Sequence, residues 1–445
     1  MKQTFTKHPY ILILFLCWQL GCNLSLDPHD IPLGDLSYQS FVAIGDGFVS
    51  GFSNSIRDSE QPLATPGLYQ QAQENSFPAL ISNQYNFVRA IGNLGPIQFN
   101  QVYYPKSGSG YLKFVDLAET NCSQPMVLAI TEQIDADVNG PTVQDSNSHN
   151  LGLPLLRVSQ LQRAELAQEN PFFGRLAGQQ SDTYLDLVEK TESDMALVWI
   201  GINDVLEYAL TGGESADFRM TDPAVFQENL RNLLDLLWAK QTKVVIGSLP
   251  NICLFPYFQT IQSVIPFNQG CNGIPQLYIE TTNQNEPVIR KARDRDLIML
   301  PVGKRIGQEE SNGDLFGLSP TSPIPHQWVL DEKEVDQVEN RVRQFNQIIY
   351  ELVAQYNGRD ELARIAVAPL GEIVDQLERD RFDNGIKLSS AHLTGGVFSL
   401  DGIYLTERGN ALVANEIIET INRFQQFQLT LPPVNVNDYA GIRFP

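Results

Sequence analysis

The sequence is poor in cysteine, histidine and basic residues. Its 445 residues include 5 cysteines, 5 histidines and 31 Lys and Arg, against 52 Asp and Glu, so the net charge is −21. The cysteines and histidines show no pair with the spacing of a zinc site, and we expect neither a metal nor another cofactor. The acidic balance argues against nucleic acid as a partner, because binding to phosphates depends on clustered Lys and Arg.

The start of the sequence also lacks an apolar run long enough to cross a membrane. Residues 10–20 are mostly apolar, but a spanning helix needs roughly 20 such residues. Two lysines precede this run and Leu20-Gly21-Cys22 ends it, which predicts a signal peptide over residues 1–21. The tripeptide resembles a bacterial lipobox, in which Cys22 is lipidated after cleavage. An ordinary secretory signal with an unmodified cysteine is the alternative.

A lipidated Cys22 would make the chain an exported lipoprotein of the cell envelope. Residues 22–38 would then be the lipidated cysteine and its tether, and the acyl chains would hold the protein at the membrane. Asn23 is not the acidic residue that retains some bacterial lipoproteins at the inner membrane. We therefore expect the outer membrane of a Gram-negative bacterium as the location.

Export also bears on the remaining cysteines. Cys253 and Cys271 lie on either side of an irregular, aromatic-rich segment, and in an exported protein a disulfide between them is plausible. Cys122 has no obvious partner, and we expect a buried thiol there.

Residues 39–445 have the composition of one packed domain. Hydrophobic residues make up 42% of the chain, which is typical of a globular protein, and no linker divides it. Apolar runs of strand length alternate with amphipathic helices, which favours an α/β fold with a parallel sheet between helices. Two loop-rich segments, near 100–150 and 251–330, are expected to be insertions. The expected strands are 40–44, 195–202, 243–249 and 363–369, and the expected helices begin at 76 and 223 or span 333–356 and 406–424.

Three segments at or near the ends of expected elements carry residues typical of a catalytic site. The first is Gly45-Asp46-Gly47, which by itself could be only a tight turn between a strand and a helix. The second is Gly201-Ile-Asn203-Asp204, in which either polar residue could simply cap a helix. The third runs from Asp401 to Tyr404, before the last expected helix. The carboxyl ends of parallel strands are where α/β folds gather their functional groups.

Together with a fourth segment, Asn150-Leu-Gly-Leu-Pro-Leu155, these motifs resemble the sequence blocks of the SGNH (GDSL) hydrolases in their order and internal spacing. The resemblance extends from about residue 39 to the end of the last helix. It implies an SGNH-hydrolase-like (flavodoxin-like) three-layer sandwich with a parallel central sheet and loop insertions. It also implies a serine-hydrolase activity on carboxylic esters.

The resemblance assigns each catalytic role of the family to a position in this sequence. Asn203 matches the amide that donates to the developing oxyanion, and Asp401 matches the carboxylate that orients the catalytic histidine. Gly47 stands in the place of the serine nucleophile, Leu155 in that of the oxyanion-hole glycine, and Tyr404 in that of the histidine. A phenol has an ordinary pKa of about 10 and cannot serve as the general base at neutral pH.

These substitutions favour a protein that has kept the fold and lost hydrolysis. We expect a pocket that binds a glycan or an acylated ligand, with segment 100–150 and Phe255-Pro-Tyr-Phe258 as walls. The residues expected at the pocket are Asp46, Gly47, Gly201, Asn203, Asp204, Asp401 and Tyr404.

Two other functions stay open. One is an active ester hydrolase, a lipase, esterase or deacetylase, with a rearranged centre. The residues that could stand in for the missing groups are Ser50, Ser53, Ser55, His149 and His392. The other is a purely structural envelope lipoprotein.

Overall fold

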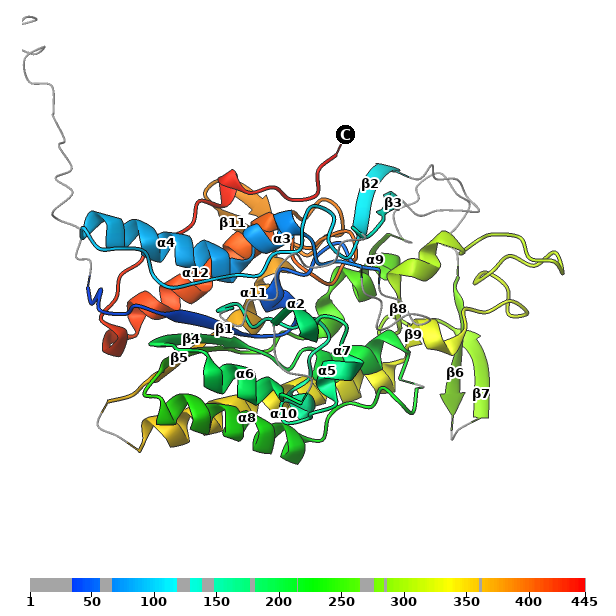
Figure 1. The fold of residues 1–445 in the computed structure, drawn as a ribbon. Helices are drawn as coiled ribbons and strands as arrows, with labels where there is room; N and C mark the ends of the chain where they lie inside the picture. The colour runs from blue at the N-terminus through cyan, green and yellow to red at the C-terminus, as the bar shows by residue number, and fades with distance from the viewer. Residues whose placement is uncertain are drawn as a thin grey trace, which may run out of the picture.

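The computed structural model describes the chain from residue 34 onward, with gaps (Figure 1). The predictions for the signal peptide, Cys22, Cys122 and Cys271 concern residues outside this description. Within it, no helix is long and apolar enough to cross a membrane. The described residues are 34–56, 66–117, 129–137, 148–176, 181–213, 215–264, 276–283, 286–359 and 362–444.

A four-stranded parallel sheet forms the centre of the molecule, in the order β1-β4-β5-β10. Its strands are β1 (Phe41–Gly45), β4 (Met195–Trp199), β5 (Lys243–Gly247) and β10 (Ile365–Ala368). They are almost uniformly apolar because helices cover both faces of the sheet, so that side chains on either face are buried. The four expected strands are confirmed, although three of them are shorter than expected.

The chain around residues 149–153 runs alongside β1 and extends the sheet on that side. The amide of Leu151 donates to the carbonyl of Ala43 at 2.8 Å, and the amide of Leu153 donates to that of Gly45 at 2.9 Å. With this segment included, the sheet has the doubly wound order 2-1-3-4-5, and the order reverses between β1 and β4. Folds of this kind bind ligands at that reversal, beyond the carboxyl ends of the strands.

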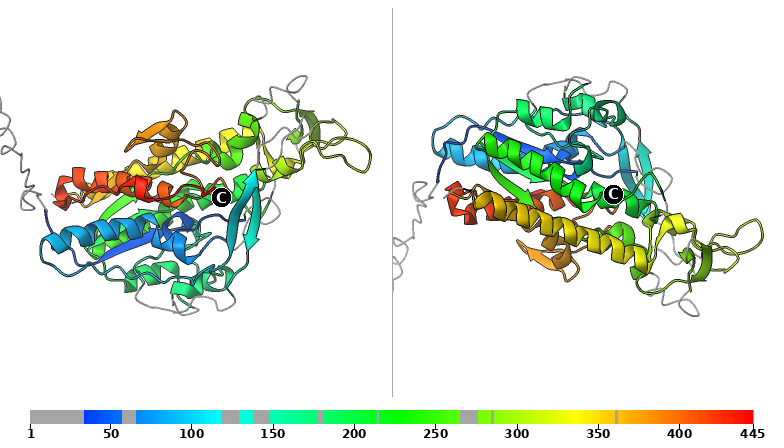
Figure 2. Two further views of the ribbon diagram at one scale, coloured as in Figure 1. Left: turned by 90° about the horizontal axis from the view of Figure 1, so that it is seen from above. Right: turned by 90° about the horizontal axis from the view of Figure 1, so that it is seen from below.

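Two layers of helices enclose the sheet (Figures 1 and 2). On one face α4 (Phe77–Ile91) packs against α12 (Glu407–Arg423), and on the other α8 (Pro223–Ala239) packs against α10 (Glu332–Asn357). Each of these helices carries buried apolar residues at helical spacing, which form the stripe that covers the sheet. The three-layer α/β sandwich predicted from the sequence is confirmed.

Side-chain caps fix where the long helices begin. Asp222 accepts a hydrogen bond from the amide of Ala224 at the start of α8, and Asp331 accepts two from the first turn of α10. Ser76 is the N-cap residue of α4, as expected, but its hydroxyl donates to the carbonyl of Gln73 and does not cap the helix.

Both expected insertions contain regular structure, and both lie at the end of the sheet where β1 and β4 terminate (Figure 1). In segment 100–150, β2 (Tyr111–Leu117) and β3 (Ala129–Ile134) form an antiparallel hairpin. In segment 251–330, α9 (Pro256–Val264) precedes the hairpin of β6 (Tyr278–Asn283) and β7 (Glu286–Lys291). The expectation of a loop-rich second segment was therefore wrong in part. The residues of β7 are largely exposed, so the strand lacks the apolar alternation that would predict it.

The remaining helices and strands are short. They are α2 (Gly47–Ser50), α3 (Gln70–Glu74), α5 (Leu166–Glu169), α6 (Tyr184–Lys190), α7 (Asn203–Leu210), α11 (Leu370–Leu377), β8 (Leu297–Ile298), β9 (Val329–Leu330), β11 (Arg381–Asp383) and β12 (Ile386–Leu388).

Candidate functional site

The first two motifs meet because the strands that precede them are neighbours in the sheet. Gly45 pairs with Trp199 at the ends of β1 and β4, and a Cβ on Gly45 would lie 2.1 Å from the carbonyl oxygen of Trp199. Only glycine allows this close approach of the two backbones. Each strand is followed by a short helix, α2 or α7, so that Asp46 and Asn203 come within hydrogen-bond reach.

Asp46 and Asn203 are fully engaged in holding these helices together. Asp46 Oδ1 accepts from the amide of Phe48 at 3.0 Å and so caps α2. Asn203 Nδ2 donates to Asp46 Oδ2 at 3.4 Å and to the carbonyl of Leu156 at 3.2 Å. An amide nitrogen has two hydrogens, and both are taken. Asn203 is 1% exposed, and its amide packs the turn between the two strands and their helices.

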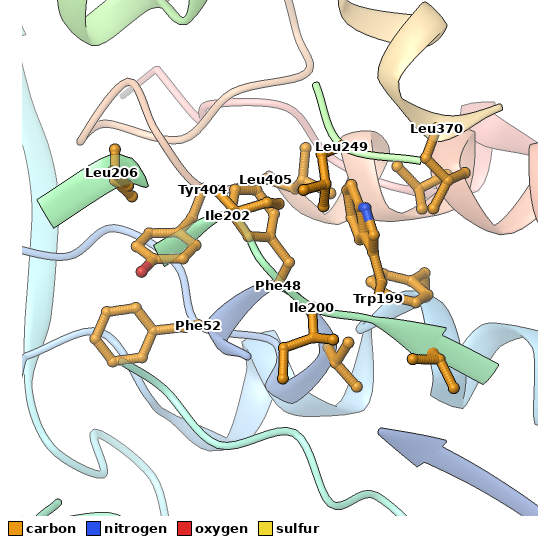
Figure 3. Close-up of a cluster of buried hydrophobic side chains, with 14 of the residues drawn as sticks. Phe48, Phe52, Trp199, Ile200, Ile202, Leu206, Leu249, Leu370, Tyr404 and Leu405 are labelled. Atoms are coloured by element: carbon orange, nitrogen blue, oxygen red, sulfur yellow. The ribbon is translucent and has the colours of Figure 1, made fainter. Parts of the chain in front are cut away.

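The side chain of Tyr404 occupies the space beside Gly47. A Cβ on Gly47 would lie 2.8 Å from Cε1 of Tyr404 and 3.2 Å from both its Cζ and its hydroxyl oxygen. The ring packs against Phe48, at 4.8 Å between centroids, and edge-on against Phe52, at 5.0 Å (Figure 3). Tyr404 is 0% exposed. Aromatic core therefore fills the volume in which a serine and a substrate carbonyl would have to meet.

Leu155 keeps the backbone conformation of the residue type that it replaces. Its φ is +67°, in the left-handed region, where a residue with a Cβ pays roughly 1–2 kcal/mol. The side chain is 7% exposed and belongs to the hydrophobic core. The burial of its isobutyl group offsets this backbone strain.

Asp401 holds the turn that presents Tyr404. Its Oδ1 accepts from the amides of Ile403 and Tyr404, both at 2.8 Å. Its Oδ2 accepts from the amide and the hydroxyl of Ser55, at 2.7 and 2.9 Å. Four donors thus stabilise the buried carboxylate. The carboxylate thus anchors the loop that carries Tyr404 to the segment of Ser55.

The other two residues expected at the pocket, Asp204 and Gly201, contact other residues of the domain. Asp204 is buried and accepts from the amide of Val158 at 2.8 Å and from the hydroxyl of Thr221 at 2.6 Å. Burial raises the pKa of Asp204, although these hydrogen bonds act in the opposite direction. Gly201 has a φ of +121°, and a Cβ there would press on the side chain of Phe226 at 2.9 Å.

The residues that could stand in for the missing nucleophile and base lie in four different surroundings. Ser50 donates to the carbonyl of Gly47 at 2.9 Å, within its own helical turn. His149 is buried, and its Nδ1 accepts from the amide of Asn100 at 3.3 Å. Ser53 donates to the carbonyl of Leu405 at 2.8 Å. Ser55 and His392, in contrast, line one cavity of about 210 Å³ together with Asp401.

A larger cavity, of about 560 Å³, opens between the β2–β3 hairpin and the residues that flank Tyr404. Tyr69 and Tyr111 stack at its wall with 4.2 Å between ring centroids, and Asn54 donates to the Tyr69 hydroxyl at 2.8 Å. Burial raises the pKa of Tyr69 to about 12. Neither tyrosine could be assigned to a site from the sequence, because the two lie far apart along the chain and belong to no motif. Only the folding of the hairpin onto the domain brings them together.

Within the described part of the chain, no group of three or more His, Cys, Asp or Glu side chains could hold a metal ion. Cys253 is buried and has no disulfide partner among the described residues, and burial raises the pKa of its thiol to about 12. Its expected partner, Cys271, lies outside the described residues, so the disulfide stays a prediction.

The doubly wound sheet, with its site at the reversal of strand order, defines an α/β protein of the hydrolase-like, flavodoxin-type class. The sequence model of the GDSL-like Lipase/Acylhydrolase family matches residues 42–417. The chain therefore belongs to the GDSL-like lipase/acylhydrolase family, as its motifs predicted.

Individual proteins resemble the chain less than the family model does. No curated protein matches the chain. Among solved structures, the chain is similar to a mutant of an acetyl-xylooligosaccharide esterase from Geobacillus Stearmophilus. The two share 10% sequence identity with a TM-score of 0.33, and the match covers 88% of this chain and 96% of the esterase.

Proposed function

We propose that this protein is a ligand-binding member of the GDSL family that does not hydrolyse esters at the family's site. The observation that carries the proposal is the contact between Gly47 and Tyr404. Position 47 supplies no nucleophile, and a Cβ there would meet the Tyr404 ring at 2.8 Å. Acyl transfer needs the reacting atoms at about 3–3.5 Å in an aligned geometry, and the ring leaves no room for a substrate there.

The other retained family residues support the same proposal. Asn203 gives its amide hydrogens to Asp46 and to the carbonyl of Leu156. A donor that stabilises an oxyanion must point at the place where the negative charge develops. Asp401 is likewise saturated by the donors of its own turn and of Ser55.

The proposed ligand site is the cavity of about 560 Å³, whose size suits a small molecule. The stacked rings of Tyr69 and Tyr111 provide an apolar wall. Glu407 lies at the cavity and accepts from Gln71 Nε2 at 2.5 Å and from Arg443 Nη2 at 3.4 Å. Aromatic surface beside amide, carboxylate and guanidinium groups suits a hydroxyl-rich ligand such as a glycan or an acylated glycan.

Lipid anchoring is part of the proposal. The lipobox-like Leu20-Gly21-Cys22 supports a lipidated N-terminus and a place in the cell envelope, with the outer membrane as the proposed location. Mass spectrometry of the protein from a bacterial host would detect the diacylglyceryl modification, and a Cys22→Ala variant should lack it.

An esterase assay tests the loss of hydrolysis. Residues 23–445 would be assayed on short-chain nitrophenyl esters and on acetylated sugars, beside Asn203→Ala and the restored variant Gly47→Ser/Tyr404→His. We expect no turnover by the native protein. Turnover that collapses in Asn203→Ala would overturn the proposal, because it would require a working oxyanion hole.

Titration with a glycan panel tests the proposed ligand site. Tyr69→Ala should weaken the binding of any glycan that the native protein holds, since stacking surface is lost. Tyr103→Ala is the matched control, because Tyr103 is 38% exposed and does not line the cavity. Equal binding by native protein and Tyr69→Ala would show that the ligand lies elsewhere.

The second candidate function is an ester hydrolase with relocated groups. It is favoured by one observation, that Ser55, Asp401 and His392 line the same cavity of about 210 Å³. Against it, the Ser55 hydroxyl donates to Asp401 and not to an imidazole. If the native protein turns over esters, loss of that turnover in both Ser55→Ala and His392→Gln would favour this candidate.

A further inference from the structure

The cavity of about 560 Å³, the proposed glycan site, is lined by equal numbers of basic and acidic residues. Its described lining contains Lys113 and Arg443, which are basic, and Glu132 and Glu407, which are acidic, and no other charged residue. These formal charges sum to zero, whereas the whole chain has a net charge of −21. The described lining is therefore neutral within a strongly acidic protein.

Each basic residue of the lining forms an ion pair with an acidic one. Lys113 and Glu132 lie opposite each other on β2 and β3, with Nζ 3.0 Å from Oε1. Arg443 Nη2 lies 3.4 Å from Oε1 of Glu407, which also accepts from Gln71 Nε2 at 2.5 Å. A charged group on a ligand would have to displace one of these partners, so it would gain no net attraction between charges.

Hydroxyl groups can bind at such pairs without displacing a partner. A hydroxyl donates one hydrogen bond and accepts others, whereas an ammonium group only donates and a carboxylate only accepts. A sugar hydroxyl can therefore donate to Glu132 or Glu407 and accept from Lys113 or Arg443. Hydrogen bonds with an ionised partner are roughly twice as strong as those between neutral groups.

A charged ligand also loses hydration that this lining does not replace. Removing an ionic group from water is costly unless an opposite charge compensates for it. At 0.15 M salt the screening length is about 8 Å, so acidic residues far from the cavity do not supply that compensation. The charges of the described lining act on a bound ligand with the least screening, and they sum to zero.

The aromatic residues of the lining fit the same kind of ligand. Tyr69 and Tyr111 stack on each other, and Phe114 packs edge-on against Phe444 with 5.0 Å between ring centroids. All four rings line the cavity, and Phe444 is half exposed. Such rings offer apolar surface to the C–H faces of sugar units, while a few polar groups fix the orientation of the ligand.

We infer that the ligand of this cavity is an uncharged glycan, whose hydroxyl groups hydrogen-bond to the two ion pairs while its sugar rings lie against the aromatic residues. The inference rests on the proposed function, because it requires that this cavity binds a glycan. It excludes uronic acids, amino sugars and phosphorylated sugars as the preferred ligands.

A panel of matched oligosaccharides tests the inference. Each set has one linkage and one length, and its members differ in the charge of each unit, as do the β-1,4-linked hexamers of glucose, glucosamine and glucuronate. Residues 23–445 would be titrated by calorimetry at 0.15 M salt and a mildly acidic pH, which keeps the amines protonated and the carboxylates ionised. In every set that binds, we expect the uncharged member to bind more tightly than either charged member by at least about 3- to 5-fold. That factor corresponds to one Coulomb interaction across about 4–6 Å of water.

The outcome separates this inference from the proposed function. A charged member that binds most tightly, and that binds more weakly to Tyr69→Ala, would overturn the inference and leave the glycan site in place. If no member of any set binds, or if Tyr69→Ala binds every member as the native protein does, the proposed glycan site is overturned together with the inference.

Two variants change the charge of the lining. Glu132→Gln leaves Lys113 without its acidic partner, so the affinity for glucuronate relative to the uncharged member should rise about 3- to 5-fold. Arg443→Gln leaves Glu407 without its basic partner, so the relative affinity for glucosamine should rise by a similar factor. Both pairs are partly exposed, and such pairs contribute little to stability, so both variants should fold, which circular dichroism would verify. Preferences that stay unchanged in both folded variants would refute the inference.

Two further variants make the same changes of charge elsewhere. Glu228→Gln, on α8, and Arg219→Gln each remove one charge at an exposed position that does not line the cavity. Neither should alter the order of affinities within a set. A shift in these controls as large as that in Glu132→Gln and Arg443→Gln would show that the overall charge of the protein sets the preference, and would overturn the inference.

Discussion

The ring of Tyr404 lies against Gly47, with Cε1 2.8 Å from the point where a Cβ on that glycine would stand. The two family positions that would carry the nucleophile and its base are thus coupled by packing in this protein. A side chain at 47 and a tyrosine ring at 404 compete for one volume. Because the ring also packs on Phe48 and Phe52, it cannot move without disturbing the core.

The first prediction concerns the substitution Gly47→Ala. We expect it to lower the free energy of unfolding by about 1–3 kcal/mol, because overpacking at the Tyr404 ring outweighs the better helix propensity of alanine. Urea denaturation would measure the change. Gly95→Ala is the control, since a Cβ at Gly95 meets nothing within 4 Å.

A double-mutant cycle tests whether the two positions are coupled. Tyr404→Ala alone should cost about 3–5 kcal/mol, as do other large-to-small changes of buried aromatic residues. The cost of Gly47→Ala should largely disappear in the Tyr404→Ala background, giving a coupling energy of at least about 0.5 kcal/mol. Additive effects would mean that the ring does not restrict position 47.

Leu155 offers a test of backbone strain. Leu153 has no positive φ and is 0% exposed. Its replacement by Gly should lower the free energy of unfolding by about 0.5–1 kcal/mol more than its replacement by Ala. At Leu155, with φ +67°, the order should reverse, and Gly should be the more stable of the two by about 1 kcal/mol. Urea denaturation of the four variants would give the order of stability of Gly and Ala at each position. The same order at both positions would argue against backbone strain at Leu155.

We expect Asp401 to stabilise the folded protein. In Asp401→Asn the amide NH₂ would face the amide of Ser55, so that a buried donor loses its acceptor at a cost of about 1–3 kcal/mol. Ser55→Ala removes only the hydroxyl contact and should cost about 1 kcal/mol. Thermal unfolding would rank the variants, and a native-like Asp401→Asn protein would be incompatible with the role of loop anchor.

The N-cap of α10 predicts a dependence of stability on pH. Burial would raise the pKa of Asp331, but hydrogen bonds from Thr281 and from the first turn of α10 outweigh it and lower the pKa below its ordinary value of 3.8. A lowered pKa contributes stability above the ordinary value, and this contribution is lost as the pH falls through the folded-state pKa. Asp331→Ala should therefore cost about 1–2 kcal/mol at pH 7 and progressively less below pH 3.8. A deficit that stays constant down to pH 2 would contradict this account.

The fold could be predicted from the sequence because its strands and helices carry strong local signals. Apolar runs buried on two faces identify the four strands, and apolar residues at helical spacing identify α8 and α10. The meeting of Asp46 with Asn203 also followed, since each motif directly succeeds a strand. The hairpin of β6 and β7 did not follow, because β7 is largely exposed and has no buried face to impose an apolar pattern.

The arrangement of side chains at the site could be predicted less well from the sequence. The motifs showed which groups had changed, but not that Tyr404 would lie on Gly47. The direction of its ring depends on the turn that Asp401 holds and on the aromatic neighbours Phe48 and Phe52, which no local pattern encodes. We expected Asp46, Asn203 and Tyr404 to line a pocket, whereas each is at most 1% exposed. The cavities lie beside them, against the β2–β3 hairpin.

The pairing of β1 with β4 has a consequence for how the chain folds. Ser40, at the start of β1, bonds through its amide to Asp194, 154 positions further along the chain. A chain synthesised from its N-terminus therefore exposes the apolar strand β1 long before its partner exists. Contacts of such high sequence separation form slowly, and unpaired apolar strands are prone to aggregation. The centre of the sheet is thus completed late, and the newly made chain has the greatest need of a chaperone while β1 waits for β4.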